Sequence, residues 1–210
     1  MPTRRSLLFC LSLLMVFGWS GHSVLAQSGA LPARATVFVD TLGKDAVSVM
    51  ANRGLNKVQR IERFRTMLKA NFDIPTIARF VLGRYWNLAT PDQQQEYFKL
   101  FEEMVVRSYA DRFDTYNGET FHIMSSRPEG EHDAFVVTEV HRLNGPPVNI
   151  EWRVRQREER LGIIDVVVEG VSMSVTQRQE FSSVIQSKGG DIGAFLQALR
   201  EKNAAMAAAQ

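Results

Sequence analysis

The stretch DVVVEGVSMSVTQRQEF, residues 165–181, contains the change from strand to helix on which the fold assignment depends. Alternation predicts two strand faces, with Asp165, Val167 and Glu169 on one and Ile164, Val166 and Val168 on the other. Gly170 permits a sharp turn after the strand, and Ser172 or Ser174 is a suitable N-cap for the helix that follows. We therefore expect strand and helix to fold back on each other, so that the apolar strand face covers either a protein core or a ligand.

The first residues of the chain predict export. Arg4 and Arg5 form a basic start, residues 7–19 are apolar, and the small residues of VLAQ at 24–27 suit a signal peptidase. We therefore expect a signal peptide at residues 1–26, cleaved after Ala26. The apolar run is shorter than the roughly 20 residues that span a bilayer, which argues against a permanent membrane anchor.

Composition indicates that the rest of the chain is one neutral domain. Removing residues 1–26 from the 210 leaves 184, and it takes away two Arg from a balance of 25 Lys and Arg against 23 Asp and Glu, so 23 against 23 remain. Such a domain has no strong attraction to nucleic acid, and no nucleic-acid partner is expected. The segment RVRQREER at 153–160 is locally basic, and we interpret it as a solvated hairpin edge. Because the domain has no cysteine, its stability must come from a buried core.

Periodicity and capping signals predict a single α+β domain. After a flexible start at 27–34, helical spacing predicts helices at 35–51, 55–70, 73–83 and 90–113. Period-two alternation then predicts strands at 119–125, 133–142, 147–156 and 161–169, separated by short turns. Two helices at 173–187 and 191–202 and a frayed tail at about 203–210 complete the chain. The expected fold is a curved four-stranded antiparallel sheet packed against several helices and enclosing an apolar pocket.

The chain shows no familiar catalytic or metal-binding motif. The three histidines outside the signal peptide, His122, His132 and His141, have no metal-ligand spacing, although His122 and His141 lie on neighbouring predicted strands and can approach each other. No serine lies in a nucleophile turn, and no cofactor motif is present. We predict no catalytic residue, metal or cofactor. One alternative stays open, a pocket enzyme that uses Asp165, Glu139 or Glu169 with a pKa raised by burial.

Two segments resemble the MlaC-type family of periplasmic phospholipid-binding proteins, also called toluene-tolerance proteins. DVVVEGVSM at 165–173, followed by TQRQEFSSVIQSKGGDI, is similar to the C-terminal part of that family. FDIPTIARFVLGRYWNLATPDQQQEYFKLFEEMVVRSYADRF at 72–113 is similar to its central segment. The similarity covers about residues 35–200. One departure is the segment with Leu161 and Gly162, where family members often carry Trp before the strand.

The resemblance implies a monomeric periplasmic carrier without enzymatic activity. Such a carrier hides the acyl chains of a phospholipid between sheet and helices, and exchanges the lipid with an inner-membrane ABC transporter complex and an outer-membrane lipoprotein complex. A polycyclic hopanoid lipid is an alternative cargo, and an NTF2-like pocket enzyme acting on a small apolar substrate is an alternative function.

On periodicity alone, the apolar residues of the long helix and of the strands favour an ordinary core. The resemblance implies that they form the wall of a lipid pocket instead. The predicted lipid-binding residues are Phe80, Trp86, Phe101, Met104, Val105, Tyr109, Ile123, Ile150, Trp152, Val154, Ile164, Val166, Val168, Val171 and Met173.

Overall fold

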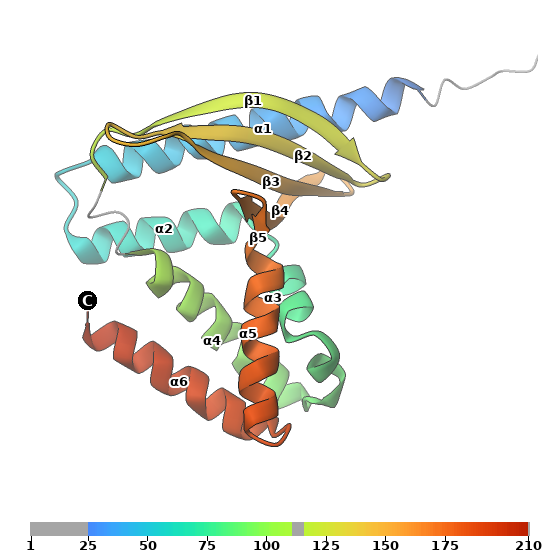
Figure 1. The fold of residues 1–210 in the computed structure, drawn as a ribbon, viewed down its shortest axis with the longest axis vertical. Helices are drawn as coiled ribbons and strands as arrows, with labels where there is room; N and C mark the ends of the chain where they lie inside the picture. The colour runs from blue at the N-terminus through green and yellow to red at the C-terminus, as the bar shows by residue number, and fades with distance from the viewer. Residues whose placement is uncertain (1–24, 111–115, 210) are drawn as a thin grey trace, which may run out of the picture.

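The computed structural model describes residues 25–110 and 116–209 (Figure 1). The helices are α1 (Leu25–Ala51), α2 (Lys57–Asn71), α3 (Ile74–Leu82), the 3-10 helix η1 (Gly83–Leu88), α4 (Pro91–Ala110), α5 (Met173–Ser187) and α6 (Ile192–Ala208). The strands are β1 (Thr120–Glu129), β2 (Asp133–His141), β3 (Val148–Arg157), β4 (Arg160–Val168) and β5 (Val171–Ser172). Most of the expected signal peptide, and residues 111–113 of the expected long helix, lie outside the described residues.

The strands form one antiparallel sheet in the order β1-β2-β3-β4-β5, which confirms the predicted α+β fold. A fifth strand of two residues is added to the four that were expected. Glu169 and Gly170 join β4 to β5 with φ angles of 49° and 78°, the pair of positive values that a two-residue hairpin turn requires. Ser172 then caps α5, since its Oγ accepts a hydrogen bond from Val175 N at 3.1 Å. The chain therefore reverses direction after β4, but α5 packs mainly against α3 and does not lie back along the strand as expected (Figure 1).

A β-bulge in β4 corrects the predicted strand faces. Arg153 pairs with Asp165 but Val154 pairs with Ile163, so Ile164 is an extra residue without a partner on β3. The alternation therefore shifts by one residue, and Ile163 instead of Ile164 shares a face with Val166. Ile163 is fully buried, whereas Ile164 is only half-buried.

Helix α1 covers one face of the sheet, which we call the inner face (Figure 1). The buried residues of this sheet core are Leu31, Ala35, Val39, Leu42, Ala134, Val136, Val154 and Ile163. Helix α1 and strand β1 approach so closely that a Cβ added at Gly43 would lie 2.6 Å from the Phe121 ring. Glycine is therefore required in the middle of α1 for packing, in spite of its low helix propensity.

The remaining helices form a second layer around a separate helical core, below the sheet in Figure 1. Its buried residues are Leu68, Ile74, Ala78, Val81, Leu82, Tyr85, Ala89, Tyr97, Phe101, Met104, Val106, Phe181, Ile185, Ile192, Phe195, Leu196 and Leu199. Tyr97 is fully buried, and its hydroxyl donates to Ala78 O at 2.9 Å. Burial also raises the pKa of the Tyr97 phenol well above its usual value.

Both ends of the described chain are helical. The segment 27–34, expected as a flexible start, belongs to α1, where Leu31 is buried in the sheet core. At the other end α6 continues to Ala208 through the segment expected to be frayed. Asn203 is buried there and donates from Nδ2 to Leu100 O at 2.9 Å.

The two cores meet where the chain passes from α2 to α3. Phe72 packs against both cores, and it forms a parallel bridge with Ile163 at the edge of β4. Asp73 N donates to Ile163 O at 2.9 Å. The helical layer is therefore attached by backbone hydrogen bonding to the end of the sheet where β4 begins.

Candidate functional site

A cleft of about 560 Å³ opens at this junction of the two cores. Its volume lies in the range of roughly 300–1,000 Å³ that is typical of ligand pockets. Three segments far apart in the sequence line it: the α2–α3 junction, one face of α4 and the β3–β4 hairpin. The lining residues are Lys69, Phe72, Asp73, Ile74, Pro75, Phe98, Lys99, Glu102, Arg155, Arg157, Arg160, Leu161 and Gly162.

The floor of the cleft is apolar. Phe72, Ile74 and Pro75 come from the α2–α3 junction, Phe98 from α4 and Leu161 from β4. Phe72, Phe98 and Leu161 are half-buried in the structure, although Phe98 packs against the helical core, Leu161 against the sheet core and Phe72 against both. These side chains therefore still expose apolar surface, and a hydrocarbon chain placed on them would remove that surface from water.

The rim of the cleft is cationic. Five of its lining residues are Lys or Arg and two are acidic, Asp73 and Glu102, which gives an excess of three positive charges. Arg157 contacts Asp73, with Nε 3.4 Å from Oδ2, and donates from Nη2 to Thr76 Oγ1 at 2.9 Å. Lys69 contacts Glu102 at 3.4 Å between Nζ and Oε1. The cleft thus combines an apolar floor with a positively charged mouth.

Arg155 is held by a buried carboxylate on the outer face of the sheet. Asp133 is only 3% exposed, and it accepts hydrogen bonds from Arg155 Nε at 2.7 Å and from Arg153 Nε at 2.9 Å. Burial disfavours its ionised form, but the hydrogen bonds and charges of both arginines outweigh that cost and lower the pKa of the Asp133 carboxyl. The Asp133 hydrogen bond in turn raises the pKa of Arg155. Arg155 is therefore a fixed part of the cleft wall.

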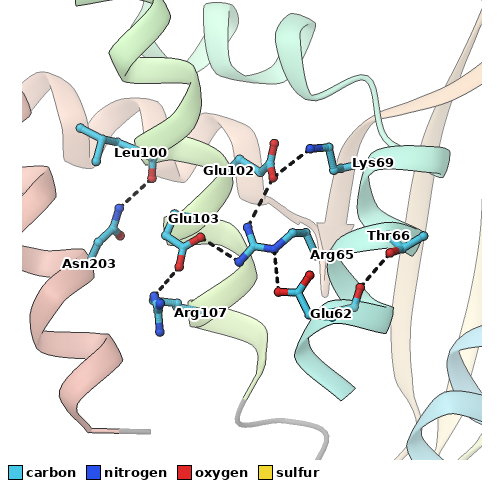
Figure 2. A network of polar contacts seen from close by, with 9 residues as sticks. All are labelled: Glu62, Arg65, Thr66, Lys69, Leu100, Glu102, Glu103, Arg107 and Asn203. Atoms are coloured by element: carbon cyan, nitrogen blue, oxygen red, sulfur yellow. Dashed lines mark hydrogen bonds and ion pairs between the residues drawn. The ribbon is translucent and has the colours of Figure 1, made fainter. Parts of the chain in front are cut away.

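An ion-pair network fixes α2 against α4 beside the cleft. Figure 2 shows Arg65 of α2 at its centre, contacting Glu62 on its own helix and both Glu102 and Glu103 on α4. The shortest of these contacts is 2.8 Å, between Arg65 Nη2 and Glu103 Oε2. Lys69 also reaches Glu102, so the network continues into the cleft rim. The two helices that carry much of the cleft are thereby held in one relative position.

The family model described as MlaC protein matches residues 40–201, most of the chain. The chain belongs to the MlaC family. A curated relative from Haemophilus influenzae, described as an intermembrane phospholipid transport system binding protein MlaC, is 24% identical over 115 residues. That match covers 53% of this chain and 54% of the relative, so the chain spans about half the length of the curated protein it matches.

A solved structure supports the same membership. The phospholipid-binding protein of Ralstonia solanacearum, determined in complex with a phospholipid, is similar to this chain with a TM-score of 0.75 and 27% sequence identity. The similarity covers 82% of this chain and 98% of that chain. The α+β arrangement of sheet and helical layer is therefore shared along nearly the whole of a protein that binds a phospholipid.

In this MlaC family member, the helical residues predicted to bind lipid do not share one wall. Phe101 and Met104 are buried in the helical core, and Trp86 and Val105 pack against that core. Phe80 is 41% exposed and has the Arg178 guanidinium 5.0 Å from its ring centroid, whereas Tyr109 is exposed on α4. Of the described residues that line the cleft, none belongs to this predicted set.

The predicted residues of the strands lie mostly on the inner face. Val154 is buried in the sheet core, and Ile123, Trp152 and Val166 pack against it. The register places Ile150 and Val168 opposite each other on the same face. The other three predicted residues differ from these: Ile164 lies at the bulge, Val171 is exposed in β5, and Met173 begins α5. Their contact with lipid stays a prediction.

The carboxylates proposed for a pocket enzyme have local structural partners. Asp165 accepts hydrogen bonds from Ser172 Oγ at 2.6 Å and from Ser174 N at 3.1 Å, and so organises the start of α5. Glu169 accepts from Asn149 N, and Glu139 lies 2.9 Å from His141 Nε2. None of the three lines the described cleft. The geometry therefore gives no support to the enzyme alternative.

The histidine pair lies as the strand order predicted, with the rings of His122 and His141 4.8 Å apart between centroids. Among the residues that the structure describes, no group of three or more His, Cys, Asp or Glu side chains is placed to hold a metal ion. Across the same residues, no helix is both long enough and apolar enough to cross a membrane.

The residues that the sequence reasoning missed are those of the cleft itself. The segment 153–160 was interpreted as a solvated edge, but Arg155, Arg157 and Arg160 line the cleft mouth. The signal that could have revealed this role is the concentration of arginine in segment 153–160 of a domain that has no net charge. Phe72 and Pro75 are not among the predicted lipid-binding residues, and their place in a binding surface depends on a bridge to β4 that no local pattern reveals.

Proposed function

We propose that this MlaC family member is a non-enzymatic lipid carrier of the periplasm, which takes up a phospholipid, shields its acyl chains in the cleft and carries it between membranes. The observation that carries this proposal is the cleft between the two cores, with its apolar floor and charged mouth. This arrangement suits a molecule with an apolar tail and a polar headgroup. The phospholipid complex of the Ralstonia solanacearum structure supports the same assignment.

The energetics favour a carrier over free diffusion of the lipid. Transfer of one methylene group out of water is worth about 0.8 kcal/mol, so an acyl chain of about sixteen carbons represents roughly 12 kcal/mol. A lipid that leaves a membrane alone must overcome most of that cost. A protein that covers the chain while leaving the headgroup at its surface lowers the barrier and needs few polar contacts to do so.

We further propose that the carrier exchanges lipid with an inner-membrane ABC transporter complex and an outer-membrane lipoprotein complex. The description of the Haemophilus influenzae relative as part of an intermembrane transport system supports such partners. The proposal requires export, with cleavage after Ala26. Protein recovered from the periplasm should therefore begin at Gln27, and an N-terminal sequence starting at Met1 would contradict export.

Native mass spectrometry of the gently purified protein, followed by organic extraction, tests the carrier function. We expect a bound phospholipid, and extraction would distinguish it from a hopanoid. Two variants on one strand face locate the tails: Leu161→Glu places a charge in the cleft, whereas Val168→Glu places the same charge farther along the inner face, outside the cleft. Both residues are half-buried, so the two variants are matched in exposure.

Leu161→Glu should remove most of the bound lipid while the protein stays folded, because an open cleft admits the water that a carboxylate needs. Val168→Glu should keep its lipid. The reverse result would place the acyl chains along the inner face of the sheet, against Ile150, Trp152 and Val166, as the sequence predicted. Absence of lipid from the unaltered protein, under conditions that preserve other lipid complexes, would refute the carrier function.

A further inference from the structure

Two cations at the cleft mouth have no ion pair with any residue that the structure describes. They are Lys99 on α4 and Arg160 at the start of β4, both of which are exposed and line the cleft. They come from opposite walls, since α4 belongs to the helical layer and β4 to the sheet. An anionic group at the mouth could contact both walls at once.

The other charged groups of the mouth are already engaged. Arg155 is bound by Asp133, Arg157 contacts Asp73, and Lys69 contacts Glu102. Glu159, the residue just before Arg160, has a side chain that is 97% exposed and contacts Arg34 at 3.7 Å. The excess positive charge of the cleft is therefore concentrated on Lys99 and Arg160.

We infer that Lys99 and Arg160 form a site for a phosphate group at the cleft mouth, and that this site makes the carrier favour lipids of net negative charge over zwitterionic lipids. The second part rests on the proposed function. Arginine and lysine donate charge-assisted hydrogen bonds to phosphate oxygens. A zwitterionic headgroup carries its own ammonium group, and repulsion of that group by the two cations offsets the attraction of the phosphate. A phosphatidylglycerol headgroup has no ammonium group, so the attraction is not offset.

Lipid competition tests the inference. The delipidated protein is incubated with vesicles of equimolar phosphatidylglycerol and phosphatidylcholine with matched acyl chains, recovered, and analysed by mass spectrometry for both lipids. We expect the protein to take up phosphatidylglycerol with a preference of about tenfold, which corresponds to about 1.4 kcal/mol. The preference should fall as salt is raised, because the mouth is open to solvent.

The decisive variant is the double substitution Lys99→Gln with Arg160→Gln, which should reduce the preference to about twofold or less while phosphatidylcholine uptake is retained. Its matched control, Arg53→Gln with Lys202→Gln, removes the same two charges from exposed positions outside the cleft and should keep the preference. Circular dichroism should show both variants folded, since all four side chains are exposed.

A second arm separates a lipid headgroup from free phosphate. Calorimetry with inorganic phosphate on the delipidated protein shows whether the site binds the ion alone, and binding that the double variant abolishes would support the phosphate site even without a lipid preference. Equal uptake of both lipids together with no phosphate binding would overturn the inference. An unchanged preference and unchanged phosphate binding in the double variant would overturn it as well. Failure to take up either lipid would count against the carrier function instead.

Discussion

The two cores of the protein are built from different kinds of side chain, and the difference bears on where a ligand can bind. The helical core contains aromatic rings in mutual contact, with Phe181 5.0 Å from Phe195 and 6.3 Å from Phe101 between ring centroids. The sheet core consists of small and branched aliphatic residues under α1. Several inner-face residues, such as Trp152 and Val166, are only half-buried there.

This contrast explains where a ligand site can form. Close-packed aromatic rings leave little room for a guest, and any change of volume there is costly. Half-buried aliphatic side chains on a sheet keep accessible apolar surface. The cleft lies where one kind of core meets the other, with Phe72 touching both. On this basis the helical core, the buried ion pair and the exposed polar connections should contribute to stability in decreasing order.

The largest effect is expected from Phe181→Ala in the helical core. The side chain is 4% exposed and contacts three other aromatic rings, so its removal should lower the free energy of unfolding by about 4 kcal/mol. Val136→Ala is the comparison in the sheet core, where a fully buried residue loses two methyl groups and about 2 kcal/mol is expected. Urea unfolding measures both. Equal losses would mean that the two cores do not differ in packing as proposed.

The second largest effect is expected from Asp133, the buried carboxylate on the outer face of the sheet. Asp133→Asn should lower the free energy of unfolding by about 2 kcal/mol at pH 7, because it removes the charge that pairs with Arg153 and Arg155. The loss stays below that of a fully buried pair, since the arginine side chains are 36% and 32% exposed and can regain water. Asp165→Asn is not a suitable control, because Asp165 accepts a hydrogen bond from Ser174 N at the start of α5. Glu131→Gln on the exposed turn is a suitable control.

The pH dependence gives a second readout of Asp133. Its pKa is lower in the folded state than the value of about 3.9 in an unfolded chain, so the folded state binds fewer protons. The stabilisation is therefore complete above about pH 5 and is lost as the pH falls through the lowered folded pKa. The Asn variant should lack this part of the acid dependence. Parallel loss of stability in both proteins between pH 5 and pH 2 would contradict the assignment.

The sequence predicted the elements better than the site, for reasons visible in particular residues. The helices expected at 73–83 and 90–113 start where Asp73 and Thr90 cap them, and a cap of this kind depends only on residues three positions apart. The bulge at Ile164 depends on pairing with β3, and the burial of Leu31 in α1 depends on packing against the sheet. The cleft joins three distant segments through the bridge between Phe72 and Ile163, which local periodicity does not contain.

A smaller effect is expected from the ion-pair network of Figure 2, which holds α2 against α4. Arg65→Gln should lower the free energy of unfolding by about 1 kcal/mol, because it leaves Glu102 and Glu103 less well compensated while Lys69 and Arg107 still contact them. The loss should shrink in high salt. Arg63→Gln, an exposed arginine on the same helix, is the control. An equal loss in both variants would show that the network adds nothing beyond general charge.

The smallest effect is expected from the polar contact that Arg34 of α1 makes with the β3–β4 hairpin. Arg34 donates to Gln156 Oε1 and to Glu159 O, both at 3.2 Å, and its side chain is 42% exposed. Arg34→Ala should therefore cost about 0.5 kcal/mol or less, since exposed pairs gain little in water. Glu159→Ala keeps the backbone acceptor and removes only the carboxylate, so a double-mutant cycle should find almost no coupling. A loss above about 1.5 kcal/mol for Arg34→Ala would mean that this polar contact, rather than burial of Leu31, attaches the start of α1 to the sheet.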